Sequence, residues 1–169
     1  MESTAVAPVP CPAPFTTTLD ATVPQIVTTD FSAAQLANYQ QALNSHVANM
    51  PYAHTFVWKP NTCCCVATSA TLTIVMRSIQ GGASATSADA GNDLFAVVGF
   101  GGVALVPSAP VYAGVARPFP ANTTVTKVVP ISGSALNKLN TEHTLSFFVE
   151  DDTSIVSATL TLSGCCLSK

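Results

Sequence analysis

The stretch from Thr144 to Cys166 contains two runs of alternating apolar and polar residues, a pattern typical of strands that bury one face. In the first run, Leu145, Phe147 and Val149 share a face. After an acidic turn, the second run places four apolar residues on one face and four hydroxyl residues on the other: Val156, Ala158, Leu160 and Leu162 against Ser157, Thr159, Thr161 and Ser163. The stretch therefore predicts a β-hairpin with one buried face, and a fold built from sheets.

A second long run of alternating residues begins at the cluster Cys63 to Cys65, and the hairpin run ends in Cys165 and Cys166. One parity of residues 64–77 is apolar: Cys64, Val66, Ala70, Leu72, Ile74 and Met76. If 64–77 and 156–166 pair antiparallel, the start of one strand lies beside the end of the other. We therefore predict disulfides between 63–65 and 165–166, with Cys64 and Cys166 on the core face. Cys11 and one remaining cysteine are then left for a bond that tethers the N-terminal arm or joins two chains.

Shorter β-prone runs fill most of the chain after residue 54, separated by turn-forming residues. They are 55–58, 94–106 with interruptions at three glycines, 111–116 and 123–129. Residues 132–140 are predicted to form one or two helical turns before the final hairpin. About seven to eight short strands with turns between them indicate an all-β protein, a β-sandwich of jelly-roll type.

Residues 1–30 are predicted to form an extended arm ahead of a sandwich domain at 31–169. Prolines alternate with small residues from Pro8 to Pro14, which favours a polyproline II conformation and excludes a helix. Two β-prone runs, 15–19 and 23–28, follow as edge strands or as strands that pair with another subunit; the alternative is a disordered tail. The apolar residues predicted to make assembly contacts are Phe15, Leu19, Val23, Ile26 and Val27.

Residues 32–50 have the three-and-four spacing of an amphipathic helix. Asp30 or Ser32 is a suitable N-cap, and Pro51 marks the end. The apolar stripe consists of Leu36, Tyr39, Leu43, Val47 and Met50. We expect this stripe to pack on the sheet; the alternative is a partner-binding face.

Charged residues are scarce: they make up 9% of the chain, against roughly 25% in ordinary soluble domains. The polar surface must then consist mostly of Ser, Thr, Asn and Gln, which fits either a protein that buries its exterior against neighbours or a secreted domain with a hydroxyl-rich exterior. The net charge is −3, and the six Lys and Arg residues are scattered along the sequence. This distribution argues against nucleic-acid binding by electrostatics. No apolar run reaches about 18 residues, so no membrane span is expected.

The cellular location has conflicting signals. The first ten residues lack the basic and apolar regions of a signal peptide. Six clustered cysteines nevertheless favour an oxidising environment. We therefore expect an extracellular or surface-exposed protein, either processed before numbering or released by lysis; the alternative is a protein with reduced thiols.

Sites for metals and catalysis are weak in this sequence. Adjacent cysteines do not have the spacing of zinc knuckles, so disulfides are preferred over zinc. Asp89, Asn92 and Asp93 surround a glycine turn and are the best candidate for a calcium site, although the same residues are common in ordinary turns. No nucleophile elbow, zinc-protease motif or phosphate loop is present, and the three histidines are scattered. We expect a protein that is not an enzyme and has no cofactor, unless calcium binds.

The closing segment F-F-V-E-D-D-T-S-I-V-S-A-T-L-T-L-S-G resembles the final hairpin of secreted bacterial β-sandwich modules. In overall plan, a cysteine-bearing N-terminal connector ahead of a jelly roll is similar to spore-appendage fibre subunits, apart from the helix between arm and sandwich. These resemblances imply a structural subunit that assembles with itself into a fibre, shell or coat, held by arm contacts and disulfides. The alternatives are a secreted carbohydrate-binding module, with or without calcium, and a virion capsid or decoration protein.

Overall fold

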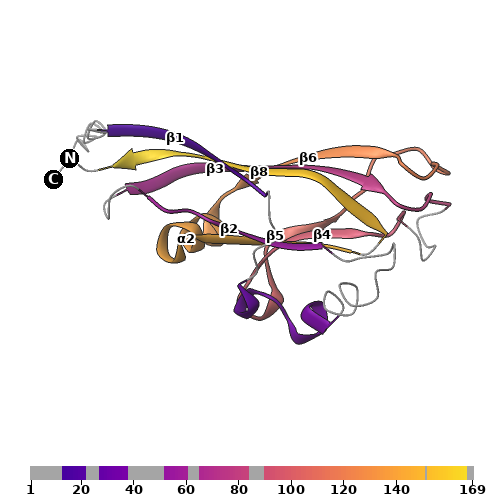
Figure 1. The fold of residues 1–169 in the computed structure, drawn as a ribbon, viewed down its shortest axis with the longest axis horizontal. Helices are drawn as coiled ribbons and strands as arrows, with labels where there is room; N and C mark the ends of the chain where they lie inside the picture. Colours follow the sequence, from indigo (N-terminus) through magenta and orange to yellow (C-terminus); the bar gives the residue numbers. More distant parts are fainter. Residues whose placement is uncertain are drawn as a thin grey trace, which may run out of the picture.

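The computed structural model describes residues 13–21, 27–37, 52–60, 65–83, 90–150 and 152–166. In this part of the chain, eight strands form two four-stranded antiparallel sheets that lie one over the other (Figure 1). Sheet A has the order β1 (Ala13–Asp20), β8 (Thr153–Cys166), β3 (Cys65–Ser78), β6 (Thr124–Ile131), and sheet B the order β2 (Tyr52–Val57), β7 (Thr144–Val149), β4 (Leu94–Gly99), β5 (Val103–Pro110). The prediction of an all-β protein with two packed layers is confirmed.

The two long strands β3 and β8 form the centre of sheet A and pair antiparallel, as predicted from their alternation. Leu72 lies opposite Leu160, and Ala70 lies opposite Leu162. The three leucines are inaccessible to solvent, because their parity faces sheet B. The core of the sandwich is therefore built largely from these two strands and β7.

Two β-bulges change which residues of these strands face the core. Between Ala67 and Ser69, β3 carries one more residue than β8, and the alternation of β3 reverses there. Cys65 is therefore buried and Val66 is 52% exposed, so the prediction that the parity of Cys64 and Val66 faces the core is wrong. Cys64 itself lies outside the described residues.

The second bulge lies in β8, where Val75 pairs with Ser157 and Met76 with Ile155. Val156 is the extra residue and is 56% exposed, while Ile155 packs against the core. The prediction that Val156 shares the core face with Ala158 is therefore wrong. A bulge adds one residue to a strand, so the residues beyond it face the opposite side from the one that a regular alternation predicts.

Three strands of sheet B, β2, β7 and β4, are largely buried on both faces, whereas the edge strand β5 is mostly exposed. Leu145, Phe147 and Val149 of β7 face sheet A, as predicted, while Phe148 faces the other way and is also buried. A second apolar cluster covers that outer face and consists of Phe31, Ala53, Val98 and Phe148, with Leu36 packed against it. The covering segment includes the 3-10 turn η1 (Thr28–Asp30) and lies below sheet B in Figure 1.

Residues 33–37 are helical and follow Ser32. The Ser32 hydroxyl accepts a 3.2 Å hydrogen bond from the Gln35 N–H. In return, the Gln35 side-chain oxygen accepts a 2.8 Å hydrogen bond from the Ser32 N–H. This reciprocal pair is a capping box. Residues 38–50 lie outside the described residues, so the rest of the predicted 32–50 helix stays a prediction.

Two connections next to sheet B were predicted from the sequence, one correctly and one wrongly. The predicted interruption of 94–106 is the turn η2 (Phe100–Gly102), where Gly101 and Gly102 have φ of 71° and 80°. The predicted strand 111–116 is wrong: residues 111–114 form turns, in which Val111 and Tyr112 point into the core.

The predicted helical turns at 132–140 form α2 (Gly133–Glu142), which closes one end of the sandwich. No helix among the described residues is long and apolar enough to cross a membrane.

Candidate functional site

One end of the sandwich is crosslinked by disulfides. Cys65 and Cys166 lie directly opposite each other on β3 and β8 and are bonded, at a sequence separation of 101. This confirms a link between 63–65 and 165–166. Cys165 is also disulfide-bonded, and its partner is not among the described residues. Cys11, Cys63 and Cys64 lie outside the described part of the chain.

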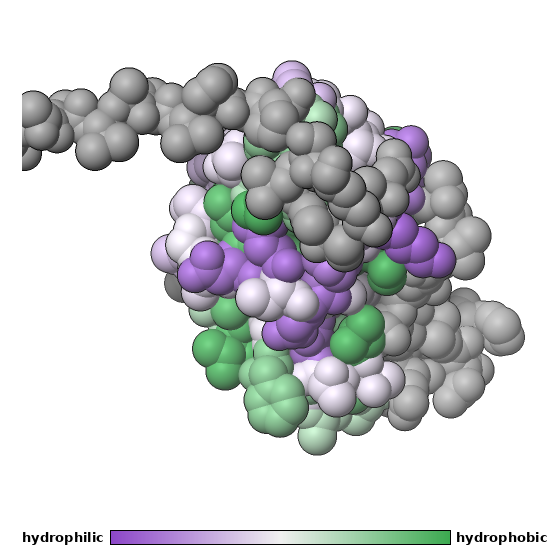
Figure 2. Space-filling view, turned by 90° about the vertical axis from the view of Figure 1, so that its left-hand side faces the viewer, coloured by the Kyte–Doolittle hydropathy of each residue, from purple (hydrophilic) through white to green (hydrophobic). Residues whose placement is uncertain are grey.

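The N-terminal strand enters the fold at this same end. Ala13 is paired with Cys166 and Pro14 with Cys165, so β1 starts where β8 finishes (Figure 1). Of the two interpretations of the 15–19 run, the structure shows the edge strand: residues 13–20 of the predicted arm belong to sheet A. Figure 2 shows this end of the molecule, with hydrophilic side chains near the middle of the view and hydrophobic ones around them.

A glycine in β8 allows the β3 backbone and the Phe15 ring to lie close to the β8 backbone. Phe15 is the strand partner of Gly164. A Cβ atom at residue 164 would lie 2.0 Å from the Val66 carbonyl oxygen and 2.8 Å from Phe15 Cε1. Any side chain there would push these groups apart, so glycine is needed at this position.

The ring of Phe15 stacks on Trp58, with centroids 5.6 Å apart. Trp58 follows β2 and is only 4% exposed, because its ring also packs edge-on against His143 at 5.5 Å. Its backbone N–H donates a 2.8 Å hydrogen bond to the His143 carbonyl. The two aromatic rings thus join the edge strands of the two sheets.

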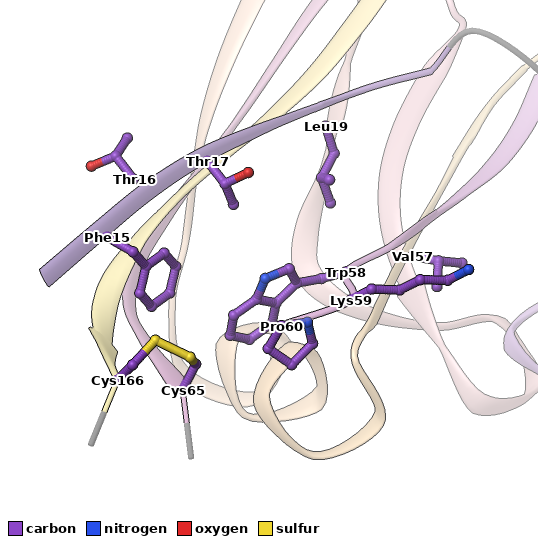
Figure 3. Close-up of a pocket in the computed structure, with 10 residues that line it drawn as sticks. All are labelled: Phe15, Thr16, Thr17, Leu19, Val57, Trp58, Lys59, Pro60, Cys65 and Cys166. Atoms are coloured by element: carbon purple, nitrogen blue, oxygen red, sulfur yellow. A yellow bond between two sulfur atoms is a disulfide. The ribbon is translucent and has the colours of Figure 1, made fainter. Parts of the chain in front are cut away.

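A pocket of about 410 Å³ opens beside these rings (Figure 3). Its lining comes from β1, from the end of β2 with the residues after it, and from the disulfide: Phe15, Thr16, Thr17, Leu19, Val57, Trp58, Lys59, Pro60, Cys65 and Cys166. In Figure 3 the disulfide lies at one end, while Val57 and the Lys59 side chain lie at the other. The lining therefore combines aromatic and aliphatic side chains with two threonines and one cationic group, that of Lys59.

A buried ion pair fastens the segment that covers sheet B. Lys138 of α2 and Asp30 of η1 are each less than 10% exposed, and Lys138 Nζ lies 3.0 Å from Asp30 Oδ1. Asp30 Oδ2 accepts a 2.5 Å hydrogen bond from the Ser146 hydroxyl, which is 2.7 Å from Thr55 Oγ1. Each polar group in this cluster is therefore satisfied by another, as buried charges require.

The same cluster shifts one pKa. Burial by itself would lower the pKa of Lys138, but hydrogen bonds and charge interactions with Glu142 and Asp30 outweigh it and raise the pKa above its usual value. Lys138 is therefore a stable cation and a poor nucleophile. The cluster is suited to holding α2, η1 and sheet B together.

The predicted calcium residues are only partly described. Asp93 is buried, and its Oδ2 accepts a 2.5 Å hydrogen bond from Thr153. Asn92 is exposed, and Asp89 lies outside the described residues, so the calcium site stays a prediction. The guanidinium of Arg117 donates to the Gly91 carbonyl, which places a positive charge at this turn. Within the described ranges, no group of three or more His, Cys, Asp or Glu could hold a metal ion.

His54 and two carboxylates beside the β7–β8 turn are held in structural contacts. His54 is 3% exposed among aromatic rings, and burial lowers its pKa to about 4. Glu150 Oε2 accepts a 2.8 Å hydrogen bond from the Leu94 N–H, and Asp152 Oδ1 accepts a 2.6 Å bond from Gln80 Nε2. These carboxylates fix the β7–β8 turn against its neighbours.

The residues predicted for assembly fall in different places. Phe15 and Leu19 pack against the core of their own chain, Val27 donates its N–H to Thr55 Oγ1 at 3.0 Å, and Val23 and Ile26 lie outside the described residues. Sequence reasoning did not find the Phe15–Trp58 stack or the Lys138–Asp30 pair, since both join distant segments. Gly164, within an alternating run, was a usable signal of a close backbone approach.

No protein-family model, curated protein or solved structure matches this chain. The resemblance to secreted β-sandwich modules and to spore-appendage subunits therefore stays a prediction. The site is interpreted from its own geometry.

Proposed function

We propose that this protein is a non-enzymatic structural subunit that assembles with copies of itself into an extracellular fibre, shell or coat. The observation that carries the proposal is the position of the disulfides. Cys65, Cys165 and Cys166 are bonded at the end where β1 begins, and Cys11 is only two residues before Ala13. The proline-rich arm and the cysteine chemistry therefore share one end of the molecule.

The composition of the outer face of sheet A supports association. This face presents hydroxyl groups in rows across β1, β8 and β3: Thr16, Thr18, Thr159, Thr161, Ser163, Ser69, Thr71 and Thr73. Some of these hydroxyls contact one another, at 3.1 Å for Thr16 and Ser163. A face with so little charge does not repel a second copy of itself.

Exposed apolar residues and an open sheet edge give further contact surfaces. Phe100 is 80% exposed, and Val103 and Val128 are each 64% exposed. The outer edge of β6 has no proline from residue 124 to 129, so its unpaired backbone groups are available to a strand from another chain. The edge strand β5 contains Pro107 and Pro110, which cannot donate to such a strand.

We also assign the sandwich to the jelly-roll type, on the basis of its strand order. Apart from β4 and β5, each described strand is followed in sequence by a strand of the other sheet. The order β1-β8-β3-β6 over β2-β7-β4-β5 puts the first and last strands side by side. Two interlocked antiparallel sheets of this kind are the architecture of many shell-forming domains.

The test of the proposed function is the size of the native protein by negative-stain microscopy and light scattering, with and without reductant. We expect regular fibres or shells, which shorten or dissociate on reduction if disulfides join the chains. A variant that lacks residues 1–12 retains all eight described strands, and we expect it to be folded and monomeric. The choice between a fibre and a closed shell, including a virion capsid, is made by the same images.

A monodisperse species at the mass of one chain, 17.4 kDa, in both conditions would exclude the proposed function. A control variant, Cys11→Ser, separates the two contributions of the arm. If it still assembles but becomes labile to dilution, the thiol locks an interface that other contacts create.

The extracellular location is part of the proposal. A disulfide that joins two strands of the core persists in oxidising compartments and is rare in the cytosol. Mass spectrometry of protein trapped with a thiol-alkylating agent at the moment of lysis checks this, with Cys65 and Cys166 expected to resist alkylation.

The second candidate function is a carbohydrate-binding module. The pocket beside Phe15 and Trp58 favours it, since aromatic rings stack on sugars. Trp58 is only 4% exposed, however, and the Phe15 ring already stacks on it. A glycan array with the monomeric variant tests this candidate, and a specific hit without self-assembly would replace the proposal above.

A further inference from the structure

We propose that the pocket beside Phe15 and Trp58 receives the proline-rich residues 1–12 of a second copy of this chain. This inference rests on the proposed function and names the surface that the arm would occupy. The contact is one between an apolar peptide and an aromatic-lined pocket.

The pocket has the chemistry of a proline-rich peptide site. Its walls are Phe15, Leu19 and Val57, with the Trp58 ring at the base and Pro60 beside it. Flat aromatic and aliphatic walls bind polyproline II segments, because these keep one conformation and lose little entropy on docking. The volume of about 410 Å³ is sufficient for a few small apolar residues rather than a folded element.

The first twelve residues match this chemistry. They read M-E-S-T-A-V-A-P-V-P-C-P and include three prolines and two valines spaced between small residues. Glu2 carries the only charged side chain among them, and Lys59 is the only charged residue in the pocket lining. Apolar residues of the arm can therefore meet the aromatic and aliphatic walls of the pocket, and the charged side chains of the two surfaces have opposite sign.

The position and length of the arm favour binding between two chains. The arm joins β1 at Ala13, beside Cys166 and therefore at the disulfide end of its own pocket. To enter that pocket it would have to reverse direction within Pro10 to Pro14, where alternating prolines favour an extended chain. Extended, twelve residues span about 37 Å, which is enough to reach a neighbouring sandwich.

Such a contact joins two different surfaces, the arm of one copy and the pocket of the next. A heterologous contact of this kind does not close on itself unless the rotation forms a ring, so it propagates as a filament.

The experiment is a complementation test with two full-length variants, both with Cys11→Ser so that only non-covalent contacts are measured. The pocket variant is Val57→Asp, at a 37% exposed residue on the rim, and the arm variant is Val6→Asp with Val9→Asp. We expect each variant to be monomeric by light scattering, whereas an equimolar mixture forms dimers. In those dimers the arm of the pocket variant fills the intact pocket of the arm variant.

A direct measurement accompanies the test. Trp58 is the only tryptophan in the chain, so its fluorescence reports on the pocket. A synthetic peptide of residues 1–12 with Cys11→Ser, titrated into the arm variant, is expected to give a saturable change in emission. The matched control is Val128→Asp in the same arm variant, at a valine on β6 that does not line the pocket, and it is expected to leave peptide binding unchanged.

Two results would overturn the inference. If the Val57→Asp chain assembles as well as the parent, the arm does not use this pocket, while the proposed structural function still stands. If the parent chain is monomeric under every condition and the peptide leaves Trp58 emission unchanged, both the inference and the proposed function fail.

Discussion

The outer faces of the two sheets have opposite character. The outer face of sheet A presents rows of hydroxyl groups such as those of Thr71 and Thr161, which lie opposite each other on β3 and β8. The outer face of sheet B is apolar and is covered by the segment that contains Phe31 and Leu36. One sheet ends the molecule with a polar surface of low charge, and the other has a second small core. The comparison shows that the outer face of sheet A is available to a neighbouring molecule, whereas the chain itself covers the apolar outer face of sheet B.

The largest loss of stability is expected when either of two adjacent phenylalanines of β7 is replaced by alanine. Phe147 faces the main core and is inaccessible, whereas Phe148 faces the outer cluster and is 9% exposed. We expect Phe147→Ala to lower the free energy of unfolding by about 4 kcal/mol and Phe148→Ala by about 3 kcal/mol. Urea denaturation measures both. A Phe148→Ala value below about 0.5 kcal/mol would mean that the outer face of sheet B is open to solvent.

A similar loss is expected when the ion pair between α2 and η1 is broken. Lys138→Met leaves the buried Asp30 carboxylate without its cation and should cost about 3 kcal/mol. The control is Glu142→Gln, since Glu142 is an exposed partner on the same helix, and its loss should cost less than about 0.5 kcal/mol. The double variant Lys138→Met with Asp30→Asn should recover most of the stability. No recovery would show that Lys138 acts through packing rather than charge.

The inner faces differ in their response to pH, because sheet B contains His54 and the strands of sheet A contain no histidine. Burial lowers the pKa of His54 from 6.5 to about 4, so the unfolded chain binds a proton more readily than the folded one. Stability is therefore complete above pH 6.5 and falls as the pH decreases towards 4, by up to about 3 kcal/mol. Denaturation at pH 7 and pH 4.5 in the parent and in His54→Gln measures this contribution, which should disappear in the variant.

The smallest changes in stability are expected at two threonines, one on the outer face of each sheet. Thr55 lies on the outer face of sheet B, where its hydroxyl contacts Ser146 and accepts from the Val27 N–H. Thr161 lies on the outer face of sheet A. Thr55→Val should cost about 1.5 kcal/mol because it leaves buried partners unsatisfied, whereas Thr161→Val should change stability by less than about 0.5 kcal/mol. Equal values in urea denaturation would contradict the difference between the two faces.

The parts of the fold that were predictable are those with regular alternation. Residues 158–162 and 70–76 alternate without interruption, and their pairing with the disulfide beyond it was predicted from that pattern. The bulges at Thr68 and Val156 were not predicted, because a single extra residue leaves no mark on composition. The burial of Phe148 was not predicted, because the segment that covers it lies more than a hundred residues earlier in the sequence.

The candidate site was predictable only in its covalent part. The positions of Cys65 and Cys166 follow from strand pairing, which local alternation indicates. The stack of Phe15 on Trp58 depends on β1 lying in sheet A and on β2 lying in sheet B, so it requires the complete topology. No local pattern encodes a contact between the edges of two sheets.

In the fibre proposed above, the Cys65–Cys166 bond would determine how tension passes through each subunit. Tension applied at residues 13 and 166 acts on neighbouring strand ends, so β1 would peel from β8 one residue pair at a time. Beyond β2, the force passes directly from Cys65 to Cys166 through the sulfur atoms. The residues between them, which contain six of the eight described strands, are then bypassed by the force and stay folded while the N-terminal strands extend.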